Sequence, residues 1–281
     1  MSDRSWPLSF EFFPPKTDAG KEKLLSARCV LAAYRPNFCS VTYGAGGSTR
    51  DNTRDTVLEI RAAGLDVAPH LSFGGDNAAA IRDLLSTYRS AGVNRVVALR
   101  GDLPTGMGGL TELVHANELV AFIREHFGDD FTIHVAAYPE IHPEAVSYQA
   151  DIHWLAEKFQ AGANAAITQY FYNIDAYWYF IDQCRKVGID QAIVPGIMPI
   201  TNFQSLARFS SNCGAEIPRW ISQRLRHYGD DPDSVRNFGI DVVSKLCEQL
   251  LDGGAPGLHF YTMNQAEPVT TILANLGRRP A

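Results

Sequence analysis

The chain has 281 residues, which is longer than an average domain but suits one α/β barrel of about 250 residues. Hydrophobic residues make up 46% and charged residues 20%, a composition that supports a large core and argues against wholesale disorder. The net charge of −6 argues against nucleic acid as a partner, because no basic surplus exists to neutralise phosphates. The five cysteines are widely spaced, and no apolar run reaches the length of a membrane span. We therefore expect a soluble, cytoplasmic protein with reduced thiols and no membrane segment.

The first part of the chain alternates short apolar segments with helical patterns. Strands are predicted over residues 8–13, 38–43, 66–73 and 95–100. Helices are predicted between them over 17–34, from Ser48 or Thr49 to about 63, and over 77–91. Thr17 or Asp18 is expected to cap the first helix, because its side-chain oxygen can accept from a free backbone N–H.

The same alternation continues to the end of the chain. Further strands are predicted over 131–138, 165–172, 192–199 and 258–263. Helices are predicted over 110–126, from Pro143 to about 161, over 175–187, as two or three helices within 202–252, and as a short one at the end. The segment Asp230-Asp231-Pro232-Asp233 is expected to begin the last long helix.

Eight strands, each followed by a helix, predict an α/β protein with a (β/α)8 TIM barrel as a single domain over residues 1–281. An open doubly wound sheet is the alternative. The loop Gly44-Ala45-Gly46-Gly47-Ser48-Thr49 fails the dinucleotide-binding test, because Thr49 stands where the third glycine belongs.

The stretch Ser9-Phe10-Glu11-Phe12-Phe13-Pro14-Pro15 places one carboxylate inside an apolar strand that ends in two prolines. Because aromatic neighbours remove water from Glu11, we expect its pKa to be raised. Such a group would donate a proton near neutral pH. The alternative is a carboxylate at a strand end that is paired with an arginine or lysine.

Polar and aromatic residues gather at the carboxyl ends of the predicted strands, where barrels of this kind carry their active sites. They are Glu11, Thr42, Tyr43, His70, Arg100, Gly101, Asp102, Tyr138, Glu140, Gln169, Tyr170, Tyr261, Asn264 and Gln265. The chain presents no nucleophile elbow, no strand lysine for a Schiff base and no histidine pair with metal-site spacing. We therefore expect no metal site, and an organic cofactor would have to perform the difficult chemical step.

Seven motifs in order resemble the methylenetetrahydrofolate reductases, with the bacterial-type catalytic domain as the match over about residues 8–277. They are Ser9 to Lys16, Val41 to Gly47, Leu99 to Asp102, Ala136 to Pro143, Gly162 to Gln169, Pro195 to Pro199, and His259 to Asn264. The family is a flavoprotein on a (β/α)8 barrel, which agrees with the strand count.

The resemblance implies a ping-pong reaction with non-covalent FAD, in which NADH or NADPH is the electron donor. It implies reduction of 5,10-methylenetetrahydrofolate to 5-methyltetrahydrofolate, which supplies methyl groups for methionine synthesis. Glu11 would be the general acid that protonates folate N10, and Asp102 would lie between flavin and pterin as the second catalytic residue. The implied folate-binding residues are Glu11, Asp102, Gln169, Phe209 and Gln265.

The implied FAD-binding residues are Thr42, Tyr43, Ala45, His70, Arg100, Gly101, Asp102, Tyr138, His142, Ala145, Asp151 and Lys158. The chain departs from the family pattern at Trp154 and Glu157, where an Asn and an Arg are frequent. Gln265 stands where an Arg is frequent, and Ser205 where a Gln is common. The first departure concerns the adenosine end of FAD, and the loss of the Arg weakens the expectation of strong binding to the glutamate tail of folate.

Two other functions remain open at this point. One is a non-catalytic or partner-dependent subunit that binds flavin or folate within a larger one-carbon assembly. The other is a different one-carbon or flavin oxidoreductase on the same scaffold. The sequence does not distinguish NADH from NADPH. An apolar helix face within 202–252 is a candidate interface for a homo-oligomer, and we expect no C-terminal regulatory domain.

Overall fold

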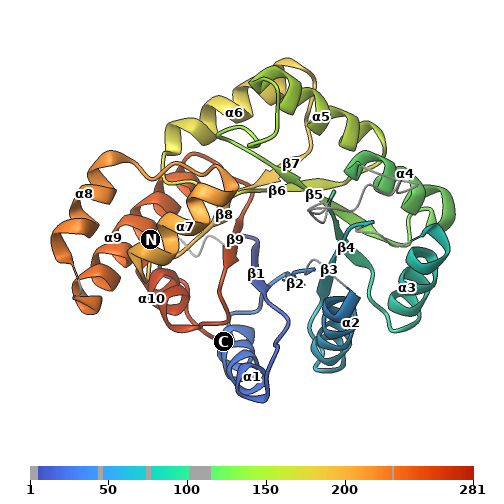
Figure 1. Ribbon diagram of the computed structural model, residues 1–281, viewed down its shortest axis with the longest axis horizontal. Helices are drawn as coiled ribbons and strands as arrows, with labels where there is room; N and C mark the ends of the chain where they lie inside the picture. The colour runs from blue at the N-terminus through green and yellow to red at the C-terminus, as the bar shows by residue number, and fades with distance from the viewer. Residues whose placement is uncertain (1–5, 44–46, 74–76, 101–114, 230) are drawn as a thin grey trace.

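The computed structural model describes residues 6–43, 47–73, 77–100, 115–229 and 231–281, without the side chains of residues 47–49. Within them, parallel strands form a ring in the centre of the protein, and helices surround it (Figure 1). The strands are β1 Leu8–Phe12, β2 Phe38–Val41, β3 Val67–Leu71, β4 Arg95–Ala98, β5 Thr132–Ala137, β6 Ala165–Thr168, β7 Ala192–Val194, β8 Gly196–Ile197 and β9 Leu258–Tyr261.

The ring closes through the segment that contains β7 and β8. In this nine-stranded sheet β7 pairs with β6, whereas β8 pairs with β9, and all pairs are parallel. Pro195 separates the two short strands, because proline has no N–H to continue a ladder. Its carbonyl oxygen still accepts from the His259 N–H at 3.1 Å. The predicted strand over 192–199 is therefore divided in two, and the prediction of a (β/α)8 barrel is confirmed.

The helices lie on the outside of the ring (Figure 1). They are α1 Asp18–Ala32, α2 Gly47–Ala62, α3 Ala78–Ser90, α4 Ala116–Phe127, α5 Tyr148–Gln160, α6 Ile174–Lys186, α7 Phe203–Cys213, α8 Arg219–Tyr228, α9 Pro232–Asp252 and α10 Glu267–Asn275. Thr17 caps α1 by accepting from Gly20 N at 3.1 Å, as predicted. No helix in the described ranges is long and apolar enough to cross a membrane.

The predicted start of the fifth helix at Pro143 is wrong. Helix α5 begins at Tyr148, because the Ser147 hydroxyl accepts from Ala150 N at 3.1 Å and caps the first turn there. Residues before this cap form a loop that follows β5, and part of that loop lines the cavity described below. The later start therefore leaves His142 and Glu144 free to face the cavity.

The two faces of β1 meet different surroundings. Phe10 and Phe12 are fully buried and belong to the main core, which includes residues of the surrounding helices. Ser9 and Glu11 point into the ring, as alternation along a strand requires. Other buried polar residues on the strands are Ser40 of β2, His134 of β5 and His259 of β9. A small separate apolar cluster contains Phe38, Ala68, Val97 and Ile167. The inward face of β1 is therefore polar, whereas its outward face is apolar.

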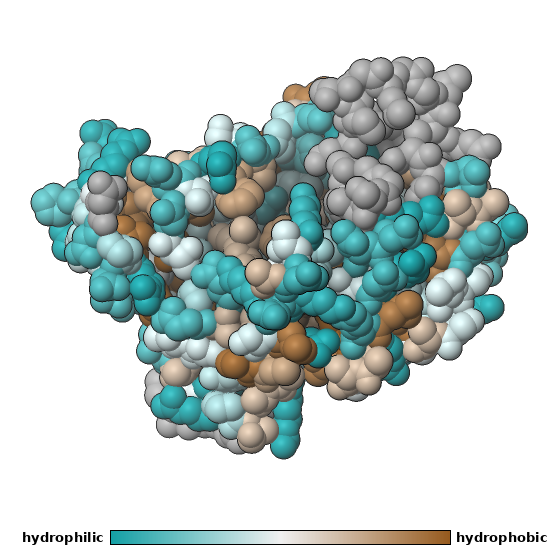
Figure 2. All heavy atoms as spheres, turned by 60° about the horizontal axis from the view of Figure 1, so that its bottom comes forward, coloured by the Kyte–Doolittle hydropathy of each residue, from teal (hydrophilic) through white to brown (hydrophobic). Residues whose placement is uncertain are grey.

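The surface is mainly hydrophilic on the face shown in Figure 2, and hydrophobic residues appear there in small separate areas. In the region predicted to carry an oligomer interface, Phe209 is 38% and Trp220 is 57% exposed. Trp220 already contacts Phe238 of its own chain edge-on, with ring centroids 6.1 Å apart. The homo-oligomer stays a prediction.

Candidate active site

A cavity of about 540 Å³ opens at the carboxyl ends of the strands. Its wall includes residues from β1, β3, β5 and β9, from the segments that follow β2, β4 and β6, and from α7. Nine of the catalytic and binding residues that the resemblance implies line it: Glu11, Thr42, Tyr43, His70, Arg100, Tyr138, His142, Gln169 and Phe209. Tyr170 and Tyr261, which were predicted at the carboxyl ends of the strands, line it too. The fold thus brings together groups that lie up to 252 residues apart in the chain, from Glu11 to Met263.

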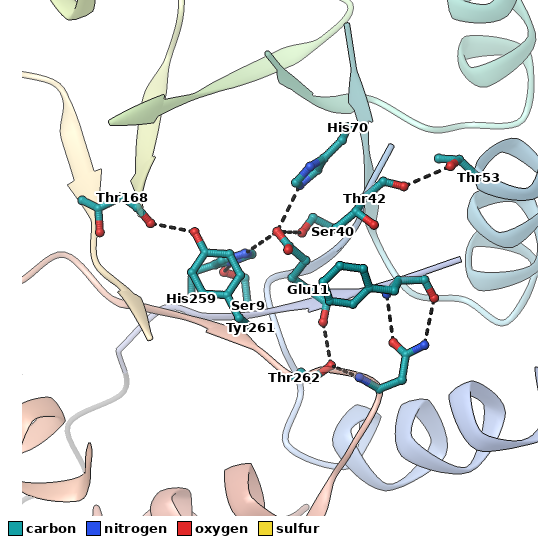
Figure 3. A network of polar contacts seen from close by, with 12 residues as sticks. Ser9, Glu11, Ser40, Thr42, Thr53, His70, Thr168, His259, Tyr261 and Thr262 are labelled. Carbon is teal, nitrogen blue, oxygen red and sulfur yellow. Dashed lines mark hydrogen bonds and ion pairs between the residues drawn. The ribbon is translucent and has the colours of Figure 1, made fainter. Parts of the chain in front are cut away.

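The Glu11 carboxylate lies between two imidazoles (Figure 3). Its Oε2 is 3.2 Å from His70 Nε2 and 3.5 Å from His259 Nε2. The Ser40 hydroxyl donates to the same oxygen at 3.4 Å. The Glu11 side chain is only 7% exposed. An acid at the inner end of the cavity is therefore held by groups from three neighbouring strands, β2, β3 and β9.

The prediction of a raised pKa for Glu11 is wrong. Burial does raise the pKa of Glu11, but the charges and hydrogen bonds of His70 and His259 outweigh burial and lower this pKa to about 2. The aromatic neighbours in sequence, Phe10 and Phe12, face the outer core and do not surround the carboxylate. The alternative of an ion-paired carboxylate is closer to the structure, with histidines in place of an arginine or lysine.

His259 is held in turn by Ser9. The Ser9 Oγ and His259 Nδ1 atoms are 2.7 Å apart, and the two residues are register partners in the β1–β9 pair. His259 is fully buried, and sequence reasoning assigned it no role. The signal was its position two residues before Tyr261, which places both side chains on the face of β9 that looks into the barrel.

Backbone groups around Glu11 are fixed by the segment that follows β9. The Thr262 hydroxyl donates to the Glu11 carbonyl oxygen at 2.6 Å (Figure 3). The Asn264 side chain accepts from Phe13 N and donates to Phe13 O, both at 2.9 Å. Phe13, which is 36% exposed, is therefore held as part of the cavity wall.

The opposite wall carries charge. Arg100 forms an ion pair with Glu144, and both side chains line the cavity. Glu144 N donates to His142 Nδ1 at 3.1 Å, so the same loop orients the histidine. Sequence reasoning missed Glu144, which follows the predicted residue His142 by two positions.

Three residues predicted to bind FAD stand behind this wall. Asp151 accepts from His142 N at 2.8 Å, and Lys158 donates to Ala136 O at 2.6 Å. Burial lowers the pKa of Lys158 to about 8 and raises the pKa of Asp151. Ala145 donates its N–H to His142 O at 2.9 Å. In this structure these groups support the wall.

Of the remaining predicted residues, the structure describes Gln265. Gln265 does not line the cavity, and its N–H donates to Thr262 O at 2.9 Å in the turn after β9. Ala45, Gly101 and Asp102 lie outside the described residues, so their roles stay predictions. Met198, Asn212 and Cys213 line the cavity and were not predicted.

The wall chemistry fits a flavin together with a second flat ligand. Phe13, Tyr138 and Phe209 offer aromatic surface to ring systems. Arg100 provides a guanidinium for phosphate groups, provided that Glu144 releases it. Such a site is able to hold a redox cofactor beside an acid that can exchange a proton.

The family model described as methylenetetrahydrofolate reductase matches residues 2–277. The chain belongs to this family. It is 40% identical to 5,10-methylenetetrahydrofolate reductases of Pectobacterium carotovorum and Escherichia coli, over 97% of this chain and 91% of each relative. It is 38% identical to methylenetetrahydrofolate reductase (NADH) 1 of Arabidopsis thaliana, over 96% of this chain but only 48% of that relative.

Among solved structures, the chain is similar to a Clostridium thermocellum protein that binds two copies of 5-methyl-5,6,7,8-tetrahydrofolic acid. The TM-score is 0.66 at 15% sequence identity, over 96% of this chain and 94% of the other. At this identity the similarity supports the barrel fold of this family member and nothing finer.

Proposed function

We propose that the protein reduces 5,10-methylenetetrahydrofolate to 5-methyltetrahydrofolate with FAD and with NADH or NADPH, in a ping-pong hydride transfer. The product would supply methyl groups for methionine synthesis. The observation that carries the proposal is the Glu11 carboxylate at the inner end of a cavity large enough for flat ligands, in a chain of this family.

FAD, when bound, supplies the redox chemistry that lets the nicotinamide and the folate react in turn over one site. Thr42, Tyr43, His70, Arg100, Tyr138 and His142 would hold it, because these residues line the cavity. Gln169 and Phe209, on the wall formed by the β6 end and α7, would contact the folate. Asp102 would contact both ligands.

Glu11 would pass a proton to folate N10, which opens the five-membered ring and leaves the methylene carbon electrophilic. In the free protein Glu11 is ionised at neutral pH, since its pKa is about 2. The carboxylate must therefore gain a proton before it donates one. His70, whose Nε2 lies 3.2 Å from Oε2, would supply that proton from its imidazolium form and become a neutral imidazole. Closure of the site by folate would favour this transfer, because loss of water disfavours the charged carboxylate.

A spectrum of the purified protein with FAD tests the proposal. We expect oxidised-flavin absorption that is bleached anaerobically by NADH or NADPH and restored by 5,10-methylenetetrahydrofolate. Tetrahydrofolate, which lacks the methylene group, serves as the control and should not restore the colour. The function is excluded if the protein takes up no FAD. It is also excluded if 5,10-methylenetetrahydrofolate does not reoxidise the reduced flavin. A comparison of the rates at which NADH and NADPH bleach the flavin identifies the electron donor.

A further inference from the structure

A hydrogen bond ties the loop after β5 to the end of α7. In that loop, Glu140 Oε2 accepts from Glu216 N at 2.8 Å. Glu216 is the third residue after Cys213, the last residue of α7. The two bonded residues are 76 positions apart in the chain. The bond is therefore a long-range contact between two segments that contribute residues to the cavity wall.

The backbone after α7 approaches the same loop closely. Gly214 ends α7 with its φ at 75°, in the left-handed region. A Cβ at Gly214 would lie 2.9 Å from Pro143 Cγ and 3.7 Å from Ile141 O. A side chain there would meet both backbone strain and a steric clash, and glycine avoids both. The end of α7 is therefore packed against the loop that carries Glu140.

Helix α7 forms one wall of the cavity. This folate wall consists of Phe209, Asn212 and Cys213, which line the cavity. A second hydrogen bond, between the Ser210 and Tyr170 hydroxyls at 3.0 Å, attaches α7 to the segment after β6. Under the proposed function the wall contacts the folate through Phe209. The contacts that hold α7 therefore set the position of the folate wall.

The loop at Glu140 contains a strained turn. Ile141 has a φ of 74°, which a β-branched residue rarely adopts, and its N–H donates to Tyr138 O at 3.3 Å. Strain of this kind persists where the surrounding structure enforces it, often at functional sites. The next residue, His142, lines the cavity. The turn therefore lets Glu140 contact the α7 side of the loop while His142, two residues later, faces the cavity.

The Glu140 carboxyl group is poorly stabilised as an anion. Burial raises the pKa of Glu140 to about 7 against the effect of the Glu216 hydrogen bond, and the Glu216 charge adds to the rise. The groups that act on this pKa in the described part of the chain include no arginine, lysine or histidine. The second oxygen, Oε1, is buried and has no hydrogen-bond partner among the described residues. Tyr170 faces this carboxyl group from the end of β6: burial raises the pKa of Tyr170, with smaller contributions from Cys213 and Glu140.

We propose that Glu140 is a positioning residue for folate: through Glu216 N it holds α7, and with it the folate wall, in the arrangement that binds the substrate. This inference rests on the proposed function and deepens it, because it assigns part of the folate affinity to a residue that does not line the cavity. Glu140 would act through α7 and not by contact with the ligand.

Protonation of Glu140 is linked to the position of α7. If α7 moved away, water would reach the carboxyl group, and its pKa would fall from about 7 toward the ordinary value of 4.5. The held arrangement therefore binds more protons, and it loses stability relative to the released one as the pH rises from 4.5 to 7. Between about pH 6 and about pH 8 the equilibrium shifts by about tenfold toward the released arrangement. We expect the folate affinity to fall with it.

Titration of the FAD-loaded protein with 5-methyltetrahydrofolate at about pH 6 and about pH 8 tests the inference, with flavin absorbance as the signal. Glu140→Gln keeps an oxygen for Glu216 N but does not ionise. Between the two conditions, the Kd of the unaltered protein should rise by up to about tenfold relative to that of Glu140→Gln. Any pH dependence from Glu11 is common to both proteins and cancels in this comparison. Glu140→Ala lacks the acceptor and should bind folate about fivefold more weakly than Glu140→Gln in both conditions.

Two further variants complete the comparison. Glu216→Gln removes the like charge beside Glu140 but keeps the backbone N–H, so the rise in Kd should be smaller than in the unaltered protein. Glu248→Gln, at an exposed position on α9, is the matched control and should behave like the unaltered protein. FAD affinity should stay the same in all variants. Thermal unfolding confirms that each variant folds, and the two glutamine variants at Glu140 and Glu216 decide the question even if Glu140→Ala does not fold.

The outcomes are distinct. A rise in Kd that occurs in the unaltered protein and is absent from Glu140→Gln supports the positioning role. The same change in Kd in both proteins overturns it while the proposed function stands. An equal loss of FAD and folate affinity in a Glu140 variant also overturns it, because the residue would then support the whole site and not α7. If the FAD-loaded protein does not bind 5-methyltetrahydrofolate at all, the proposed function fails and this inference fails with it.

Discussion

His259 connects Ser9 to Glu11: its Nδ1 lies 2.7 Å from the Ser9 hydroxyl oxygen, and its Nε2 lies 3.5 Å from Glu11 Oε2. A neutral imidazole carries one N–H, so the two contacts depend on each other. When the Ser9 hydroxyl donates to Nδ1, the proton of the ring is on Nε2 and faces the carboxylate. In that arrangement the Nε2–H of His259 stabilises ionised Glu11.

Glu11→Gln separates the two halves of the proposed reaction. Glutamine keeps the size of the side chain but has no acidic proton, so folate reduction should fall by about 10²- to 10⁴-fold. Reduction of the flavin by the nicotinamide should proceed as in the unaltered protein, because that step needs no proton from this group. Stopped-flow measurement of each half-reaction provides the comparison. Normal folate reduction in the variant would remove Glu11 from the acid role.

His259→Asn should raise the pKa of Glu11. Burial pushes this pKa upward, and His70 together with His259 holds it at about 2, so removal of one imidazole shifts the balance toward the protonated acid. The pH profile of the folate half-reaction should move to higher pH, and infrared spectroscopy should detect a protonated carboxyl at a higher pH than before. His227→Asn, at an exposed position on α8, is the control. Identical profiles for both variants would contradict the assignment.

His134→Gln should make the protein less sensitive to acid. Burial, and to a smaller extent Arg95, lowers the pKa of His134 to about 3 from an ordinary value of 6.5. The unfolded chain therefore binds more protons than the folded one between these values, and the free energy of unfolding falls as the pH falls from 6.5 toward 3. His134→Gln has no imidazole at this position, so its free energy of unfolding should not fall for this reason.

Urea unfolding at about pH 7.5 and about pH 4.5 measures how much His134 contributes to the loss of stability in acid. The midpoint of the unaltered protein should drop more between the two conditions than that of His134→Gln. His227→Asn should behave like the unaltered protein. Parallel drops in all three proteins would show that His134 is protonated in the folded state.

Gly196→Ala should disrupt the closure of the barrel. A Cβ at this position would lie 2.1 Å from Thr168 O and 2.7 Å from Tyr261 Cε2, and the backbone oxygen cannot move without disturbing β6. Gly64→Ala is the matched control, because its φ of 85° brings left-handed strain of about 1–2 kcal/mol but no atom lies within 4 Å. The urea midpoint should fall much further for Gly196→Ala. Equal midpoints would mean that β8 can shift at little cost.

Much of the fold was predictable because the signals are local. Thr17 and Asn77 were placed at or near helix starts, and both cap helices with their side chains. The carboxyl-end positions of Glu11, Tyr43 and His70 follow from strand order alone, since parallel strands bring those ends to one face. The start of α5 was missed, because a proline that is acceptable in a first turn competed with a true cap at Ser147.

The sequence by itself determined the alternation of strands and helices, the family motifs and the gathering of polar groups at one end of the barrel. These depend on neighbouring residues and on periodicity, which a sequence displays directly. The tertiary structure alone decided the charge state of Glu11, because its partners His70 and His259 arrive from strands 59 and 248 residues away. It also placed Asp151 and Lys158 behind the wall and left Trp154 exposed beside them. Electrostatics and packing depend on distances through space, and only the folded chain sets those distances.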